Sequence, residues 1–338
     1  MECGDGPTSY RSMRVFIEGL GFMKLQQLLY VREVARRGLN VSAAADALHT
    51  AQPGVSSQIR LLEDELNVQI FERNGKRLVG ITEPGRSILE MAERVLQEVE
   101  NIKKVGGEYS SEASGRLSIA TTHTQARYAL PQAVTAFKQR YPDVRLELHQ
   151  GSPVHVAELT AKGEVDLAIA TEALDDYSDL ITLPCYEWNR CVVCPPGHPL
   201  LAEKRLTIEV LARYPIVTYD PTVAGRSKIN KAFEGAGLTP NVVLTAIDSD
   251  VIKTYVQLGL GVGILAEMAF DPDRDKDLRS VDASHLFDSS TTLIGLRRGA
   301  YLRRYLYDFI ELLMPKLTRN VVENAMLGQT SRQPEGEV

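Results

Sequence analysis

The sequence predicts an α/β chain in which an all-α N-terminal domain is followed by one long helix and then by the α/β region. Three observations predict this architecture. Apolar residues three and four apart, the spacing of a helix face, recur before residue 83. A narrow apolar stripe then continues through residues 83–107. From Arg116 onward, strand-like apolar runs alternate with helical patterns, an order typical of α/β folds.

Residues 41–62 predict two short helices that meet at a tight turn, a helix-turn-helix. The first contains Ala43–Ala45, small residues that let a second helix cross closely, and Ser42 is its candidate N-cap. The second begins at Gln52 with Pro53 in its first turn, where a missing N–H costs nothing. Its apolar residues fall on one face: Val55, Ile59 and Leu62.

The opposite, polar face of the second helix is typical of a recognition helix in the major groove of DNA. Its side chains can donate to phosphates and base edges. The residues predicted to contact DNA from the two helices are Ser42, Gln52, Pro53, Ser56, Ser57, Gln58 and Arg60. An ordinary helical hairpin with a solvated face is the alternative interpretation.

A β-hairpin is predicted immediately downstream, because Asn74-Gly75 stands between two short apolar runs. Basic residues cluster at its tip, where they would lie on the phosphate backbone as a wing. The predicted wing contacts are Arg73, Lys76 and Arg77. A solvated basic turn is the alternative. With this hairpin, the predicted winged helix-turn-helix domain spans residues 23–82.

The charge distribution supports a contact with DNA although the whole chain is acidic. Residues 23–88 hold nine Lys and Arg residues against seven Asp and Glu residues, a net charge of +2. Because the whole chain carries −6, the remainder carries −8. Basic charge therefore gathers where double-stranded DNA would bind, and the acidic remainder limits non-specific binding.

Residues 83–107 predict a linker helix with one narrow apolar stripe. The stripe consists of Ile88, Leu89, Ala92, Val95, Leu96, Val99, Ile102 and Val105. A narrow stripe suits a seam between two chains, and a dimer would present two recognition helices to two half-sites. Packing within the same subunit is the alternative. The glycine-rich stretch from Gly106 to Gly115 predicts a hinge.

Beyond this hinge the predicted strands and helices alternate. The strands are 117–121, 144–149, 165–170, 191–193, 216–219, 242–247 and 263–266, and the helices are 126–141, 154–161, 248–258 and 301–317. Strands in this order predict parallel sheets. Two such sheets, connected near residue 184 and again near residue 290, would form two lobes with a cleft between them.

The chain has four cysteines, Cys3, Cys185, Cys191 and Cys194. Cys191 and Cys194, with His198 nearby, invite a zinc-site interpretation. Their segment alternates like a strand, however, and strand positions three apart point to opposite faces. We therefore expect buried thiols that behave as small apolar side chains, and no metal site.

The sequence contains no apolar run long enough to span a bilayer and no secretory signal pattern, so a cytoplasmic protein without a membrane partner is expected. Residues 1–22 fit no periodic pattern and are expected to be a disordered extension, with Met13 and Met23 as alternative starts. Residues 326–338 are expected to be a disordered tail. P-loop, nucleophile-elbow and His-Glu-x-x-His motifs are absent from the sequence, and no catalytic residue is predicted.

The order of these features resembles the LysR-type transcriptional regulators. The segments that resemble the family's N-terminal domain are residues 52–59 (QPGVSSQI), 71–73 (FER) and 82–85 (TEPG). Four further segments are most similar to the family's CysB-like branch, which governs sulfur assimilation: 121–128 (TTHTQARY), 186–190 (YEWNR), 225–227 (GRS) and 250–255 (DVIKTY). The resemblance covers residues 23–325.

This resemblance implies a two-lobed, periplasmic-binding-protein-like effector domain over residues 115–325. Lobe I would comprise residues 115–184 and 290–325, and lobe II residues 185–289. It also implies promoter DNA as the target, a homodimer or homotetramer as the assembly, and RNA polymerase as a further candidate partner.

Polar residues at predicted strand ends mark a candidate effector site. Thr122, Thr124 and Gln125 follow the first strand at the start of a helix, where unpaired N–H groups favour anions. Thr171 follows the strand at 165–170, and Ser227 begins a helix in the other lobe. A plain helix N-cap is the alternative role for Thr122.

The resemblance adds Trp188 and the position of Ala224 to this site. It implies a small effector (sulfate, thiosulfate, acetylserine or adenosine phosphosulfate), and no other cofactor is expected. CysB-like proteins typically carry Thr where this chain has Ala224. Loss of that hydroxyl would cost an anion one hydrogen bond, about 1 kcal/mol, and would leave space for a bulkier effector.

Three classes of function are compatible with parts of the sequence. A LysR-type regulator of cysteine biosynthesis or sulfonate use fits all of it, with a regulator of another pathway as the alternative within that class. An enzyme with an accessory DNA module would require turnover of a metabolite. A solute-binding transport protein would fit the two lobes but not the helix-turn-helix.

Overall fold

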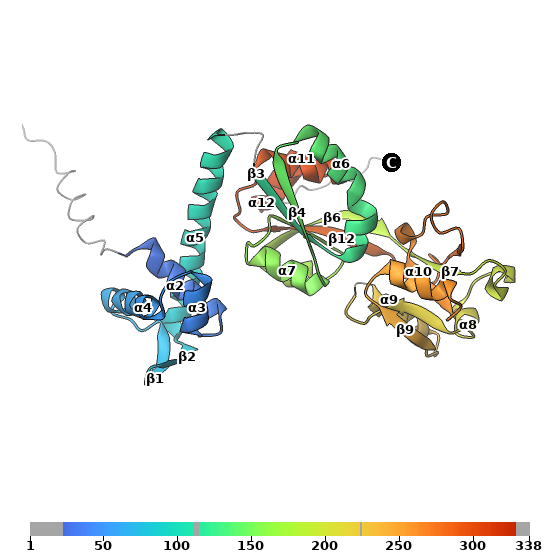
Figure 1. Cartoon of the computed structure of the whole chain (residues 1–338), viewed down its shortest axis with the longest axis horizontal. Helices are drawn as coiled ribbons and strands as arrows, with labels where there is room; N and C mark the ends of the chain where they lie inside the picture. Colours follow the sequence, from blue (N-terminus) through green and yellow to red (C-terminus); the bar gives the residue numbers. More distant parts are fainter. Residues whose placement is uncertain (1–22, 111–114, 224, 329–338) are drawn as a thin grey trace, which may run out of the picture. The chain divides into compact units, whose positions relative to one another are not determined.

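The structure of the chain, a computed structural model, describes residues 23–110, 115–223 and 225–328 (Figure 1). The predictions for residues 1–22, for Ala224 and for the tail beyond residue 328 lie outside the described residues. Contacts divide the chain into two units between Lys103 and Lys104. Each unit has a hydrophobic core of its own.

The N-terminal unit consists of helices and one hairpin. Its elements are α2 (Leu25–Arg36), α3 (Val41–Ala47), α4 (Gln52–Leu66), β1 (Phe71–Asn74), β2 (Arg77–Ile81) and most of α5 (Glu83–Ser110). Val55, Ile59 and Leu62 are buried on the inner face of α4, as their spacing predicts, in one cluster with Val31 and Val34 of α2. Each such buried side chain contributes about 1.5–3 kcal/mol. This core therefore keeps the polar face of α4 turned outward.

The hairpin forms where Asn74-Gly75 predicts it. Strands β1 and β2 pair antiparallel, with Asn74 opposite Arg77 and two residues between them. Gly75 has a φ of 61°, a conformation that glycine adopts without a steric penalty. Among the described residues, the wing is thus a short two-stranded sheet that projects its tip residues into solvent.

The predicted N-cap of the first helix of the motif is wrong. Helix α3 begins at Val41, and its N-cap is Asn40, whose backbone is extended (φ −88°, ψ 99°). The Asn40 side-chain oxygen accepts a hydrogen bond from the Ala43 N–H at 3.0 Å. Ser42 lies inside the first turn, exposed to solvent. Asn and Ser cap helices about equally well, so the sequence alone does not decide between Asn40 and Ser42 as the N-cap.

The apolar stripe of α5 is only partly buried. Ala92 and Leu96 are buried in the core of the N-terminal unit, which is packing within the same subunit. Val95 and Ile102 of the stripe stay 41% and 70% exposed. These two exposed residues are the part of the stripe on which the predicted seam with a second chain depends.

The first part of the predicted hinge is helical instead, because α5 runs through Gly106 and Gly107 to Ser110. Glycine lowers helix stability by about 1 kcal/mol relative to Ala, and at Gly107 the Arg303 side chain lies beside the backbone. A Cβ at this position would lie 3.0 Å from the Arg303 guanidinium. The rest of the predicted hinge, residues 111–114, lies outside the described residues.

The C-terminal unit contains two lobes, each built on a five-stranded sheet. Lobe I comprises β3 (Gly115–Thr121), the π-helix η1 (Gln125–Ala129), α6 (Leu130–Arg140), β4 (Val144–Gln150), α7 (Pro153–Ala161), β5 (Leu167–Ala170), η2 (Leu174–Asp176), β6 (Leu180–Trp188), β12 (Ser290–Arg297), α11 (Arg304–Leu313) and α12 (Arg319–Met326). Lobe II comprises β7 (Arg190–Cys194), η3 (Pro199–Ala202), α8 (Ile208–Leu211), β8 (Ile216–Tyr219), α9 (Arg226–Gly235), β9 (Val242–Ala246), α10 (Ser249–Gln257), β10 (Val262–Ala266), η4 (Glu267–Ala269) and β11 (Arg279–Asp282).

The sheets are mixed rather than parallel, which corrects the prediction. The strand order is β4-β3-β5-β12-β6 in lobe I and β11-β7-β10-β8-β9 in lobe II. β12 and β7 run antiparallel to their neighbours. Each is the strand that the chain enters after crossing from the other lobe. It therefore starts where the lobes meet, whereas the other strands of its sheet end there.

Helices cover both faces of each sheet (Figure 1). In lobe I, α6, α11 and α12 share a core with one face of the sheet, and α7 packs on the other. In lobe II, α8 and α9 lie on one face and α10 on the other. The helix predicted for residues 301–317 is shorter, since α11 ends at Leu313, and a further helix that was not predicted, α12, follows it. Pro315 lies between them, where its ring and missing N–H stop the first helix.

The cysteines of β7 point to opposite faces of the sheet, as their spacing predicts. Cys191 packs in the cluster under α10, and Cys194 packs in the cluster under α8 and α9. Burial raises the pKa of both thiols to about 11. They are free and buried, so they pack as apolar side chains.

Within the described part of the chain, no helix combines the length and the apolar character needed to cross a membrane.

Candidate functional site

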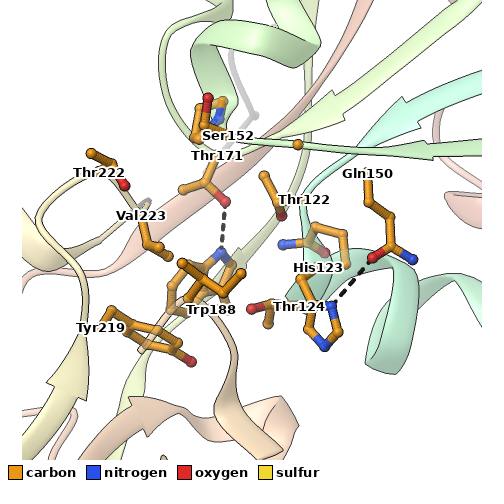
Figure 2. A pocket seen from close by; sticks show the side chains of 14 residues that line it. Thr122, His123, Thr124, Gln150, Ser152, Thr171, Trp188, Tyr219, Thr222 and Val223 are labelled. Atoms are coloured by element: carbon orange, nitrogen blue, oxygen red, sulfur yellow. Dashed lines mark hydrogen bonds between the residues drawn. The ribbon is translucent and has the colours of Figure 1, made fainter. Parts of the chain in front are cut away.

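A cavity of about 220 Å³ lies at the carboxyl ends of strands from both lobes. Figure 2 shows side chains from the two lobes facing one another across it. Its lining among the described residues is Thr122, His123, Thr124, Gln125, Gln150, Gly151, Ser152, Pro153, Thr171, Trp188, Tyr219, Thr222, Val223 and Ile247. Carboxyl ends of strands are where open α/β folds bind ligands.

A buried hydrogen-bond network forms one wall of the cavity. Trp188 Nε1 donates to Thr171 Oγ1 at 3.3 Å, and Thr171 Oγ1 lies 3.3 Å from Thr292 Oγ1. Gln125 Nε2 donates to the same Thr292 hydroxyl at 3.1 Å, and the Tyr186 hydroxyl donates to Gln125 Oε1. The network fixes the orientation of the Trp188 indole and the Gln125 amide, because every member is held by a neighbour.

Thr122 has a different environment from this network. Its side chain is buried, and its hydroxyl has no hydrogen-bond partner among the described residues. Thr122 is also the last residue before the helical segment that starts at His123, and the Ala126 N–H bonds to its backbone carbonyl at 3.0 Å. The Thr122 carbonyl thus accepts a hydrogen bond from the first turn of the helix, and the Thr122 hydroxyl faces the cavity.

Tyr219 closes the lobe II side of the cavity. Its hydroxyl accepts from the Ala266 N–H at 3.0 Å and lies 2.7 Å from Ser249 Oγ. Burial raises the pKa of Tyr219, whereas its hydrogen bonds with Ala266 and Ser249 lower it. The net shift is upward, so the phenol stays neutral and can act as a donor as well as an acceptor.

Two helix starts point at the cavity. One is the segment from His123 that leads into η1, and the other is α7, whose N-cap is Ser152. The Ser152 hydroxyl accepts from the His155 N–H at 3.3 Å. The first N–H groups of a helix have no partner within it and carry partial positive charge. Such N–H groups, together with neutral hydroxyl and amide groups, are the chemistry that small anions favour.

The two lobes are joined at one rim of the cavity by Asp250. Its carboxylate accepts from the Tyr128 hydroxyl at 2.7 Å and pairs with Arg127 and Lys253, both at 3.2 Å. Burial raises the pKa of Asp250, but these hydrogen bonds and cations outweigh burial and hold it below its ordinary value. Because Tyr128 belongs to η1, the π-helix places one residue at the cavity and another at the lobe contact.

His123 lies beside the same carboxylate. Its Nδ1 is 3.2 Å from Gln150 Oε1, and its Nε2 is buried with no partner among the described residues. His123, Asp248 and Asp250 bring potential metal-ligand atoms within 4.8 Å of one another. The cations already paired with Asp250 balance much of this negative charge. The expected absence of a metal ion stays a prediction.

Arg190 connects the two segments through which the chain passes from one lobe to the other. It is 1% exposed, and its guanidinium donates to the carbonyls of Asp288 and Gly225 at 3.0 and 3.1 Å and to Ser290 Oγ at 2.9 Å. It also lies 4.9 Å from the ring centre of Trp188. Gly225 has a φ of 84°, and a Cβ there would overlap the guanidinium. This close approach explains the glycine.

Most of the predicted effector residues lie together. Thr122, Thr124, Gln125, Thr171 and Trp188 all line the cavity. Ser227 does not: it is exposed in the first turn of α9. Ala224 lies outside the described residues.

Sequence reasoning missed the second helix start and most of the lobe II wall. The lining residues outside its list of effector contacts are His123, Gln150, Gly151, Ser152, Pro153, Tyr219, Thr222, Val223 and Ile247. Ser152-Pro153 directly after a strand is an N-cap and first-turn signature that was available in the sequence. The lobe II residues carry no such local signal.

The predicted DNA-contacting residues of α4 lie opposite its buried face. Gln52, Pro53, Ser57 and Arg60 are exposed, while Ser56 and Gln58 are half-buried. Gln52 Nε2 donates to Ser56 Oγ at 3.1 Å. Lys76 and Arg77 are exposed at the wing and have no ion-pair partner among the described residues.

Arg73 differs from the other wing cations. Its Nη2 donates to Glu63 Oε2 at 2.6 Å, and its side chain is 22% exposed. A guanidinium committed to a buried carboxylate is not a free phosphate contact, which argues against the predicted role of Arg73.

Comparison with known proteins decides the family. Residues 25–86 match the family described as "Bacterial regulatory helix-turn-helix protein, lysR family", and residues 110–318 match "LysR substrate binding domain". The chain belongs to the LysR family. It is a LysR-type transcriptional regulator, with a helix-turn-helix domain for DNA and a two-lobed effector domain.

Among its relatives in the LysR family are regulators named CysB, SsuR and cbl. The chain is 54% identical to CysB of Burkholderia cenocepacia over 307 residues, 91% of this chain and 98% of that protein. It is 53% identical to SsuR of the same organism over 295 residues, with coverage of 87% and 96%. It is 43% identical to cbl of Escherichia coli K12 over 316 residues, with coverage of 94% and 100%.

Solved structures of the LysR family share the fold. The cofactor-binding domain of the Cbl transcriptional regulator is 43% identical, with a TM-score of 0.61 and coverage of 64% of this chain and 94% of that chain. A full-length OxyR variant from Pseudomonas aeruginosa is 23% identical, with a TM-score of 0.63 and coverage of 87% and 97%. The latter likeness concerns the fold alone.

Proposed function

We propose that this LysR-type regulator controls genes of sulfur assimilation and responds to a small sulfur metabolite or anion in the cavity between its lobes. The chemistry of the cavity carries the proposal. Its described lining is rich in hydroxyl and amide groups, lies at two helix starts, and includes no Lys, Arg, Asp or Glu. Neutral donors at helix N-termini suit a small anion, since they supply hydrogen bonds without a fixed counter-charge.

The size of the cavity favours the smaller candidate effectors. Sites for drug-sized ligands measure about 300–1,000 Å³, whereas this cavity measures about 220 Å³. Sulfate, thiosulfate and acetylserine suit that volume better than adenosine phosphosulfate. The effector contacts in this proposal are Thr122, Thr124, Gln125, Thr171 and Trp188; Ala224, which the sequence added to them, lies outside the described residues.

The sulfur role rests on the similarity to CysB, SsuR and cbl over most of the chain. Cysteine biosynthesis and sulfonate use are the two candidate target sets. A LysR-type regulator of another pathway, with a different effector, is the alternative.

The proposed mechanism joins the two units through assembly. Polar residues of α4 and the wing bind promoter DNA, and the exposed stripe of α5 supports a homodimer or homotetramer in the cytoplasm. Effector binding favours one arrangement of lobes and subunits, and so one DNA-bound state, over another. RNA polymerase is the proposed downstream partner.

Calorimetric titration of the full chain tests the effector assignment. The wild type, Thr122→Ala and Thr135→Ala are titrated with sulfate, thiosulfate, O-acetylserine, N-acetylserine and adenosine phosphosulfate. Thr135 is the control, because it is exposed on α6 and bonds only to its own helix, at the Pro131 carbonyl. The proposal expects saturable binding of one compound, weakened by Thr122→Ala alone. Absence of binding by all five would contradict the sulfur effector and leave the family assignment intact.

A further inference from the structure

Glu63, near the end of α4, connects the recognition helix to the wing. It is 7% exposed, an unusual position for a carboxylate. Its Oε1 accepts from the backbone N–H groups of Ile70 and Phe71 at 2.9 and 3.2 Å. Its Oε2 accepts from Arg73 Nη2 at 2.6 Å. One side chain of α4 thus bonds to three residues at the start of the hairpin.

The hairpin is shaped to make this contact. The β1–β2 register shifts between Glu72 and Arg73, since Glu72 pairs with Gly80 and Arg73 pairs with Leu78. A bulge of this kind twists a hairpin and re-aims the neighbouring side chain. Here the re-aimed side chain is Arg73, which turns to α4, while Lys76 and Arg77 remain exposed and without an ion-pair partner among the described residues.

We propose that Glu63 and Arg73 form a brace that sets the position of the wing on the recognition helix, and that Lys76 and Arg77 carry the wing's contact with phosphate. The inference rests on the proposed binding of promoter DNA by this domain. Glu63 and Arg73 are therefore positioning residues. They act on DNA affinity through the wing rather than by touching DNA.

The brace predicts an effect of opposite sign to simple electrostatics. Glu63→Gln removes a negative charge beside the DNA-binding face, and charge alone would make it bind DNA more tightly. The brace predicts weaker binding, since the glutamine amide turns a donor toward the Arg73 guanidinium. The variant retains one oxygen for the Ile70 and Phe71 N–H groups, which favours retention of the fold. Glu65→Gln is the matched control, because Glu65 is exposed on the same helix and has no partner among the described residues.

The experiment uses the full chain and a DNA duplex that the wild type selects from a random-sequence pool. Affinity is measured over a series of salt concentrations for the wild type, Glu63→Gln, Arg73→Gln, Arg73→Lys, the double variant Glu63→Gln/Arg73→Gln, Glu65→Gln and Lys76→Gln. Hydroxyl-radical footprinting maps the DNA protected by the wing, and circular dichroism melting monitors the fold.

The brace predicts that Glu63→Gln and Arg73→Gln each weaken binding about 10-fold, the ratio that corresponds to 1.4 kcal/mol. The double variant should be no weaker than the worse single one, because both remove the same interaction. Wing protection should disappear while protection by α4 remains, and Arg73→Lys should recover part of it. Lys76→Gln should reduce the salt slope by about 0.9 for the phosphate that it no longer neutralises, and Glu65→Gln should not weaken binding.

Two results would overturn the brace. One is tighter or unchanged binding by Glu63→Gln. The other is a salt slope that Arg73→Gln reduces as much as Lys76→Gln does, while Glu63→Gln still shows the protection of DNA by the wing. That result would make Arg73 a phosphate contact. If Glu63→Gln melts before it can be assayed, the salt slope and the footprint of Arg73→Gln decide: an unchanged slope with lost wing protection supports the brace, and a slope reduced as in Lys76→Gln overturns it. Failure of the wild type to select any duplex would instead overturn the proposed DNA binding, and the role of the brace with it.

Discussion

Replacement of Thr122 by valine should separate ligand binding from stability. Thr122 is buried, and its hydroxyl has no partner among the described residues, so valine removes a donor and keeps the volume. Loss of a buried hydroxyl that has no protein partner is neutral or stabilising. We therefore expect the melting temperature of the unliganded variant to equal or slightly exceed that of the wild type.

The same replacement should cost the complex a hydrogen bond. A hydrogen bond to a charged acceptor contributes about 1.5–3 kcal/mol, against about 0.5–1.5 kcal/mol for a neutral pair. For an anionic effector, these values predict a Kd about 13- to 160-fold higher in Thr122→Val. Calorimetry gives the Kd, and differential scanning calorimetry without ligand gives the melting temperature. Thr122→Ser, which retains the hydroxyl, should bind nearly as the wild type does.

Thr171→Val is the informative contrast. The Thr171 hydroxyl is bonded to Trp188 and lies beside Thr292 in the buried network, so its loss should lower stability by about 0.5–1.5 kcal/mol per bond as well as affinity. A Thr122→Val variant that melts lower than the wild type and binds the effector equally well would refute the reasoning, because Thr122 would then be a structural N-cap.

Three further predictions concern other parts of the molecule. The double change Gln52→Ala and Arg60→Ala should weaken specific DNA binding by about 1–3 kcal/mol for each base that is no longer contacted. A gel-shift titration measures this, and an unchanged specific affinity would contradict the assignment of these residues to DNA. Asp250→Asn should lower the melting temperature at neutral pH. The pKa of Asp250 lies below its ordinary 3.8, so its contribution is present above that value and should fade as the pH drops further; a difference from wild type that persists at pH 2 would contradict this. Cys191 and Cys194, with thiol pKa values near 11, should resist alkylation at pH 8 until the chain is denatured, as peptide mass spectrometry can show.

Local patterns predicted the elements that have a local cause. The Val55, Ile59 and Leu62 face, the Asn74-Gly75 turn and the opposite orientation of Cys191 and Cys194 all follow from spacing along a helix, hairpin or strand. Predictions failed where two local signals competed. Asn40 caps α3 although Ser42 was an equivalent candidate, and α5 passes through Gly106 and Gly107 although two adjacent glycines favour a break.

The features that depend on how the chain passes between the two lobes could not be predicted from one sequence. Strands β6 and β12 went unrecognised, since β6 contains Pro184 and β12 pairs with strands far away along the chain. Without these crossings, nothing places Tyr219 or Val223 opposite Thr122 in the same cavity. The charge of Arg73 likewise suggested a phosphate contact, and only the fold reveals its partner Glu63.

The emission of Trp188 tests the central claim most directly, because it is the single tryptophan of the chain and it lines the proposed effector cavity. The full chain is titrated with sulfate, thiosulfate, O-acetylserine and N-acetylserine while tryptophan fluorescence is recorded, in the wild type and in Thr122→Val. The account predicts a saturable change in emission with one of these compounds, shifted to at least about 10-fold higher concentration in the variant. Emission that no compound alters, or a saturable change that Thr122→Val leaves unshifted, would contradict it.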